Sequence, residues 1–132
     1  MIRTIIGLLI AAQAFLPQQT AAAELSLDAT ACDSRQRLAP GDVLKIRLPG
    51  NPTTGYLWQV TALPSLLSQS REPEHTASDR RYVGGGGFTT FTFRASARQG
   101  GILELAYRRP WETNDSPLRT CRLTVEELAE VR

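Results

Sequence analysis

The chain has 132 residues, which suits a single domain, and its 15 basic and 13 acidic side chains give a formal charge of +2. A charge this close to neutral argues against binding to nucleic acid or lipid by bulk electrostatics. Beyond the N-terminal segment, no apolar stretch is long enough to span a bilayer.

The first 23 residues have the features of a secretory signal peptide. Arg3 supplies the positive start, residues 5–16 form an apolar run too short to cross a bilayer, and Ala21-Ala22-Ala23 provides small residues for cleavage before Glu24. A buried N-terminal helix is the alternative. We expect an exported protein, periplasmic or secreted, with residues 24–132 as the mature domain and no membrane attachment after cleavage.

Two cysteines, Cys32 and Cys121, lie near the two ends of this mature domain. A cysteine pair in an exported chain predicts a disulfide. In the chain-entropy model, closing a loop of about 90 residues stabilises the fold by ~4–5 kcal/mol. The alternatives are buried free thiols or lipidation of Cys32, although Cys32 lies far beyond the apolar run.

Alternation of apolar and polar residues dominates the mature chain and predicts strands. Residues 63–67 fit either a helical turn or a strand, and residues 68–79 fit a loop with room for a short edge strand. Trp58 is expected to anchor the core. Six or seven short strands between turn signals predict an all-β fold, an immunoglobulin-like antiparallel β-sandwich of about seven strands. The clearest strands cover residues 25–29, 44–48, 56–60, 91–95, 103–107 and 121–125.

The first of three unusual loops is Asn51-Pro52-Thr53-Thr54-Gly55-Tyr56. Pro52 fixes its own φ and favours an extended Asn51, whereas Gly55 can adopt a positive φ without steric cost. Thr53 and Thr54 are small and polar. This composition predicts a stiff, nearly uncharged wedge, and an ordinary strand connection is the alternative.

The second loop contains Gly84, Gly85, Gly86 and Gly87. Four glycines leave the backbone groups unshielded, so the segment can flex or pair with the backbone of another chain. A phosphate-binding loop would need a helix to begin after the glycines, but the following Phe88-Thr89-Thr90-Phe91 is strand-like. A flexible hairpin loop is the alternative.

The third loop contains Arg109-Pro110-Trp111, directly after the strand pattern that ends at Tyr107. Trp111 is therefore expected on a loop that Pro110 stiffens, and Trp and Arg are enriched at interface hot spots. The alternative is a tryptophan that folds back over the end of the sandwich.

No residue pattern predicts catalysis or a metal site. His75 is the only histidine and lies in a polar stretch, whereas a catalytic triad needs a histidine beside a nucleophile in a cleft. One histidine and two cysteines that we expect to be bridged do not make a zinc site.

In order and spacing, the three loops resemble those of the chagasin-type inhibitors of papain-like cysteine proteases. The matching motifs are Asn-Pro-Thr-Thr-Gly-aromatic at residues 51–56, the glycine loop followed by Phe91 and Phe93, and Arg-Pro-Trp at residues 109–111. The resemblance spans about residues 40–125. The Cys32–Cys121 pair is not part of that family pattern.

The resemblance implies an immunoglobulin-like sandwich with all three loops at one end, where they enter the protease cleft. Thr53 and its neighbours would lie at the catalytic Cys–His pair, the glycine loop along the substrate-binding cleft, and Trp111 on an aromatic surface of the protease. It implies no cofactor and no covalent step, and we expect a monomer.

An exported immunoglobulin-like adhesion or carbohydrate-binding module is the rival hypothesis, because one fold serves many functions. In that case exposed aromatic side chains such as Trp111 and Tyr82 would stack on sugars, and Thr53 would not matter. We favour the inhibitor.

Overall fold

The computed structural model describes residues 22–77, 86–112 and 116–128. The expected signal peptide falls almost entirely on residues 1–21, outside the described residues, as do Tyr82, Gly84 and Gly85. Within the described ranges no helix is long and apolar enough to cross a membrane. The described strands are β1 (Glu24–Leu27), β2 (Arg35–Leu38), β3 (Val43–Gly50), β4 (Leu57–Ala62), β5 (Leu67–Gln69), β6 (Glu74–Ala77), β7 (Gly87–Ala95), β8 (Gly101–Arg108) and β9 (Arg119–Glu127), with two 3₁₀ turns, η1 (Ala29–Ala31) and η2 (Pro52–Thr54).

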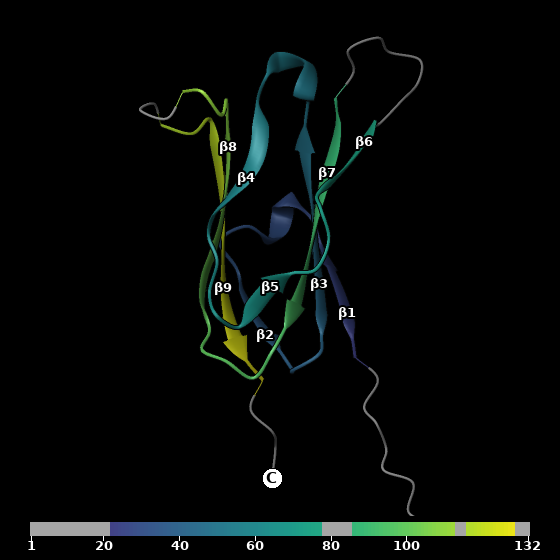
Figure 1. The fold of residues 1–132 in the computed structure, drawn as a ribbon, viewed down its shortest axis with the longest axis vertical. Coiled ribbons are helices and arrows are strands. Elements are labelled where there is room, and N and C mark those ends of the chain that lie inside the picture. Colours follow the sequence, from purple (N-terminus) through teal and green to yellow (C-terminus); the bar gives the residue numbers. More distant parts are fainter. Residues whose placement is uncertain (1–21, 78–85, 113–115, 129–132) are drawn as a thin grey trace, which may run out of the picture.

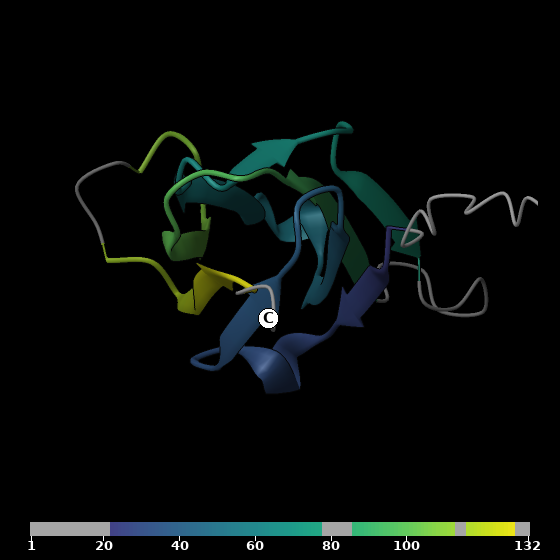
Figure 2. The same ribbon diagram turned by 90° about the horizontal axis from the view of Figure 1, so that it is seen from below.

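These strands form two sheets that face each other across the core (Figures 1 and 2). One sheet has the order β1-β3-β7-β5, with β6 also pairing with β7, and the other has the order β2-β9-β8-β4. The predicted β-sandwich is confirmed. The long central pairs are antiparallel, whereas the edge pairs β1–β3 and β2–β9 are parallel.

The core follows the alternation expected from the sequence. Side chains at every second position of the long strands point between the sheets, since successive side chains of a strand face opposite sides. Trp58 is buried, as predicted, and its indole Nε1 donates to the backbone oxygen of Pro49 at 2.9 Å. Other core side chains of the long strands that are at most 2% exposed include Leu44, Ile46, Leu48, Phe91, Phe93, Leu103, Leu105, Cys121, Leu123 and Val125.

The structure differs from the predicted elements at short segments. The first strand ends at Leu27 rather than at residue 29, because the Asp28 carboxylate accepts from the backbone N of Thr30 at 2.9 Å and starts η1. Residues 63–67, which fit either a helical turn or a strand by sequence, form a turn leading into β5. The described part of the 68–79 segment contains β6 as a short strand on β7. These short edge strands raise the described total to nine, above the predicted seven.

A disulfide joins Cys32, just after η1, to Cys121 on β9, with the two Cα atoms 4.9 Å apart. The predicted pairing is therefore present. Cys32 lies in the connection that leaves β1 of one sheet and enters β2 of the other, so the bridge ties this crossing segment to the centre of the second sheet. The two cysteines are 89 residues apart in the sequence, so the disulfide closes a long loop. For such a loop the chain-entropy model gives a stabilisation of the folded state by ~4–5 kcal/mol.

Replacing both cysteines, Cys32→Ala together with Cys121→Ala, should lower the free energy of unfolding by about 2–5 kcal/mol, because the unfolded chain regains the entropy that the crosslink removes. Urea unfolding of the oxidised parent and the double variant measures the difference. Equal midpoints, or two titratable thiols in the native unreduced parent, would contradict this expectation.

Candidate functional site

Three connections gather at one end of the sandwich (Figure 1). They are the β3–β4 turn that contains η2, the start of β7, and the segment that follows β8. Both ends of the described chain lie toward the opposite end. The fold thus brings the described parts of the three predicted loops to one surface, away from residues 22 and 128 at the ends of the described chain.

The first loop is a capped 3₁₀ turn. Asn51 is extended, as predicted before proline, and its side-chain Oδ1 accepts from the backbone N of Thr53 at 3.1 Å and from its hydroxyl at 2.6 Å. Gly55 ends the turn with φ 84°, the left-handed conformation that glycine adopts without strain. Its N–H donates to the oxygen of Pro52 at 3.0 Å. Every residue of the turn is therefore fixed by a bond within the loop.

The third loop packs directly on the first. A Cβ atom built on Gly55 would lie 2.7 Å from Cη2 of Trp111, so the indole ring occupies the space that a side chain would need. Arg109 adds three contacts: its Nε donates to the Thr54 oxygen at 3.3 Å, its guanidinium lies 4.6 Å from the Tyr56 ring centre, and its Nη1 pairs with Glu112 at 3.3 Å. The two loops form one unit.

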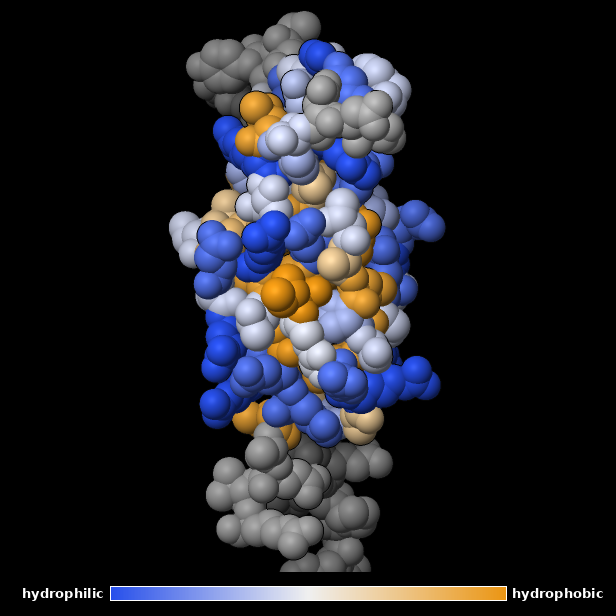
Figure 3. All heavy atoms as spheres, turned by 90° about the vertical axis from the view of Figure 1, so that its left-hand side faces the viewer, coloured by the Kyte–Doolittle hydropathy of each residue, from blue (hydrophilic) through white to orange (hydrophobic). Residues whose placement is uncertain are grey.

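Trp111 remains 69% exposed despite this contact, the highest exposed fraction among the large apolar side chains of the described residues. The indole rests on the first loop at the end of the sandwich and leaves most of its own surface exposed. Apolar side chains on the face shown in Figure 3 are interspersed with hydrophilic ones. The large exposed apolar residues are Leu57, Leu63, Ile102, Trp111, Leu118 and Leu128.

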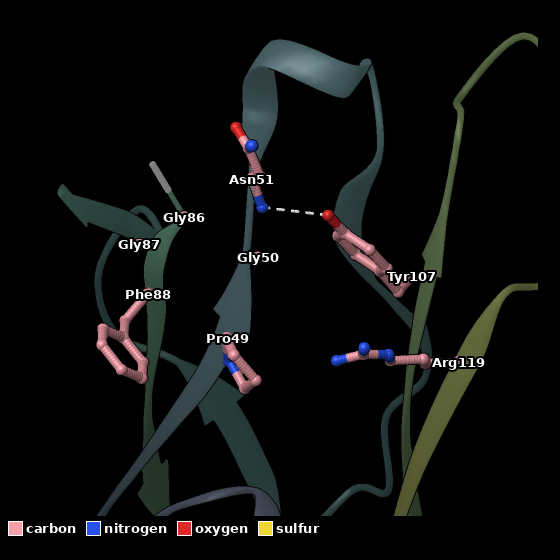
Figure 4. Close-up of a pocket in the computed structure, with 8 residues that line it drawn as sticks. All are labelled: Pro49, Gly50, Asn51, Gly86, Gly87, Phe88, Tyr107 and Arg119. Atoms are coloured by element: carbon pink, nitrogen blue, oxygen red, sulfur yellow. Dashed lines mark hydrogen bonds between the residues drawn. The ribbon is translucent and has the colours of Figure 1, made fainter. Parts of the chain in front are cut away.

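Buried aromatic side chains support the first loop from below. Tyr107, only 7% exposed, accepts a hydrogen bond on its hydroxyl from the backbone N of Asn51 at 3.0 Å (Figure 4). Its ring lies 5.4 Å from that of Tyr56 and 5.1 Å from that of Trp58. Sequence reasoning placed Tyr107 in the core and missed this role; a tyrosine where a core strand meets a loop was the available signal, since a buried hydroxyl needs a partner.

The described glycines of the second loop lie beside the first loop. Gly87 pairs with Gly50 of β3 and with Ala77 of β6. A Cβ atom at Gly87 would lie 2.3 Å from the backbone oxygen of Thr76, so only glycine fits there, whereas one at Gly86 would meet open space. Of the predicted site residues, the structure brings together Asn51, Pro52, Thr53, Thr54, Gly55, Tyr56, Gly86, Gly87, Arg109, Pro110 and Trp111 at this end.

Two carboxyl groups outside the three loops, those of Asp28 and Glu104, have a pKa below the usual value. The Thr30 hydroxyl lowers the pKa of Asp28. The Thr61 hydroxyl, followed by Arg122, lowers that of Glu104. The described residues contain no group of three His, Cys, Asp or Glu side chains that could hold a metal ion.

Comparison with known proteins agrees with this arrangement. The family model described as chagasin family peptidase inhibitor I42 matches residues 37–125. Chagasin from Trypanosoma cruzi is 31% identical over 78 residues, 56% of this chain and 71% of chagasin. Amoebiasin-1 from Entamoeba histolytica is 35% identical over 79 residues, 58% of this chain and 74% of amoebiasin-1.

A solved structure shares the fold. The crystal structure of the cysteine protease inhibitor EhICP2 from Entamoeba histolytica aligns with a TM-score of 0.72 at 24% identity, covering 82% of this chain and 98% of that one. The family match covers most of the chain and includes the first and third loops together with the glycine segment. The chain therefore belongs to the chagasin family of peptidase inhibitors and is an inhibitor rather than an enzyme.

Proposed function

We propose that this chain is a reversible, tight-binding inhibitor of papain-like, cathepsin-L-type cysteine proteases that blocks the active-site cleft with its three loops. One observation carries the proposal: Arg109 and Trp111 pack on the loop of residues 51–56 and make a single exposed unit beside Gly86 and Gly87. Family membership supports the inhibitory role, and the description of EhICP2 as a cysteine protease inhibitor supports cysteine proteases as the target class.

The conformation of the first loop accounts for inhibition without cleavage. A papain-like thiolate attacks a substrate carbonyl presented in the groove, and the oxyanion that forms needs free hydrogen-bond donors beside it. In η2 the oxygens of Asn51 and Pro52 already accept from the backbone N of Thr54 at 3.2 Å and of Gly55 at 3.0 Å. Arg109 holds the oxygen of Thr54. In this proposal, Thr53 at the exposed tip fills the groove while the carbonyl oxygens of Asn51, Pro52 and Thr54 stay hydrogen-bonded within the chain.

Preorganisation favours tight binding. Ordering a loop on association costs free energy, and a loop that is already fixed avoids most of that cost. The bonds of Asn51, the contact of Trp111 with Gly55 and the anchoring by Tyr107 all exist in the free chain. Binding energy is therefore not spent on shaping the wedge.

The glycine segment has a separate proposed role. A glycine segment carries no side chain to hold another backbone away, which suits contact with an extended segment along the substrate-binding cleft. Trp111, on the other side of η2, would pack on an aromatic surface of the protease. The full proposed contact consists of residues 51–56, 84–87 and 109–111.

We also propose that residues 1–23 are a signal peptide and that residues 24–132 act in the periplasm or outside the cell. The Cys32–Cys121 disulfide supports this location, because disulfides persist in oxidising compartments and are rare in the cytosol.

Titration of active papain, and of a cathepsin-L-like protease, with purified residues 24–132 tests the function. Hydrolysis of a small fluorogenic substrate should fall stoichiometrically and recover on dilution, with the added chain left uncleaved. Undiminished hydrolysis at micromolar chain with both enzymes would overturn the proposal and favour the adhesion or carbohydrate-binding hypothesis.

Trp111→Ala should weaken inhibition by ~2–4 kcal/mol, a 30- to 1,000-fold rise in the inhibition constant, because a largely exposed tryptophan on a rigid loop has the properties of a hot spot. Inhibition assays with papain measure the change. Ile102→Ala is the matched control, since Ile102 is 53% exposed and lies near the opposite end of the sandwich. Equal inhibition by the Trp111 variant and the parent would contradict the role.

Gly55→Ala should reduce both stability and inhibition. The new Cβ would lie 2.7 Å from Trp111, and the left-handed backbone at φ 84° costs a non-glycine residue about 1–2 kcal/mol. Gly41→Ala separates the two effects, because Gly41 has φ 91° but meets only a contact at 3.9 Å. It should lose similar stability and keep full inhibition. The account fails here if both variants inhibit like the parent.

Thr53→Arg should abolish inhibition, because a long charged side chain at the tip of the wedge cannot enter the groove. Thr53 is exposed, so the melting temperature should stay within a degree or two of the parent's. Thr53→Ser, which keeps the hydroxyl that donates to Asn51, should remain a good inhibitor. Unimpaired inhibition by the arginine variant would show that the first loop does not enter the cleft.

A further inference from the structure

One inward-facing position at the loop end of the sandwich carries a charge. Along β9 the inward positions are Cys121, Leu123 and Val125, each at most 2% exposed, and the same alternation makes Arg119 the next inward position. Apolar side chains fill the preceding inward positions, whereas Arg119 is exposed and charged. Arg119 is at the exposed margin of the core, where the two sheets open toward the loops.

Gly50 of β3 pairs with Gly87 of β7 on the opposite sheet, and both line a pocket of about 370 Å³ at this end of the sandwich. Its walls include Asn51 and Phe88 on one side, and Tyr107 and Arg119 on the other (Figure 4). The pocket opens beside the first loop and the glycine segment, so it is continuous with the proposed protease contact.

The pocket offers hydrogen-bond donors of the kind that a carboxylate needs. Arg119 is the cross-strand partner of Tyr107, and no carboxylate of the described residues pairs with its guanidinium. The Tyr107 hydroxyl accepts from Asn51, and its own proton has no acceptor among the described residues. A planar guanidinium matches a carboxylate with two parallel hydrogen bonds, and a phenol proton can supply a third.

The neighbouring arginines are already engaged. Arg109 pairs with Glu112, and Arg108 donates to the side chain of Gln59 at 3.0 Å. Of these three arginines at the loop end, Arg119 is the one without a side-chain partner in the described chain. Its charge is available to a partner that approaches this end.

We propose that this pocket binds an aspartate or glutamate side chain on the rim of the target protease's cleft, and that Arg119 is a specificity-determining residue. The inference rests on the proposed function. It adds an electrostatic contact, outside the three loops, that selects proteases with an acidic group at the matching place. A side chain enters beside Asn51, which forms both a wall of the pocket and the cap of the first loop.

Inhibition constants and dissociation rates of the parent, Arg119→Ala and Arg119→Lys test the proposal, with papain and a cathepsin-L-like protease at low and high salt. Arg119→Ala removes one partner of a charge-assisted hydrogen-bonded pair. Toward a protease that carries the acidic side chain, its inhibition constant should be about 10- to 100-fold higher than that of the parent, mainly because the complex dissociates faster. The gap between parent and variant should narrow at high salt. The lysine variant should recover part of the loss.

Arg98→Ala is the matched control, because it removes the same charge from the exposed turn between β7 and β8, at the far end of the sandwich. It should inhibit within twofold of the parent. For the sensitive protease, replacing single rim carboxylates by amides should identify one that makes the Arg119→Ala substitution nearly neutral, as a double-mutant cycle requires.

The outcomes separate the two claims. If the parent inhibits both proteases and the Arg119→Ala variant inhibits each of them as strongly as the parent does, this inference is overturned and the proposed function stands. A parent that inhibits neither overturns both. Titration with acetate, followed by NMR, tests binding of a free anion. If the Arg119 and Tyr107 resonances shift saturably while the Arg119→Ala variant inhibits proteases as strongly as the parent, the pocket binds a free anion and the proposal is overturned.

Discussion

The end of β3 is held by two hydrogen bonds from buried aromatic side chains, and the arrangement of the loops depends on them. Trp58 donates to Pro49, and Tyr107 accepts from Asn51. Gly50, between these two residues, allows both rings to approach: its missing Cβ would lie 3.3 Å from each. Because the core fixes where β3 ends, it also fixes where the first loop begins and where the third loop can rest upon it.

The charge distribution at this end follows from the same packing. Arg109 is used internally, over Tyr56 and against Glu112, and serves to join two loops. Arg119 occupies the last inward position of β9 and lines the same pocket as Gly50 and Gly87. The two arginines therefore have different roles: Arg109 joins the two loops, and Arg119 is available for contact with the protease.

Much of this could be predicted from the sequence. The alternation of apolar and polar residues predicted the sandwich and its core, because long half-buried strands carry a strong period-two signal. The signal-like N-terminus together with the pair of cysteines predicted the disulfide. The sequence allowed short strands near β5 and β6 but could not fix them, since three or four residues are too few to establish a period. The contacts of Trp111 with Gly55 and of Tyr107 with Asn51 join residues 56 positions apart, and no local pattern encodes them. The pocket beside Arg119 likewise needs both sheets in place.

The central claim is that the free chain already has the shape that fills the protease cleft. A crystal structure of residues 24–132 bound to papain tests it most directly. The account predicts η2 at the catalytic thiol with Thr53 foremost, Trp111 still seated on Gly55, and backbone shifts in both loops within about 1 Å of the free chain. A complex in which Trp111 leaves Gly55, or in which another face of the sandwich meets the protease, would contradict it.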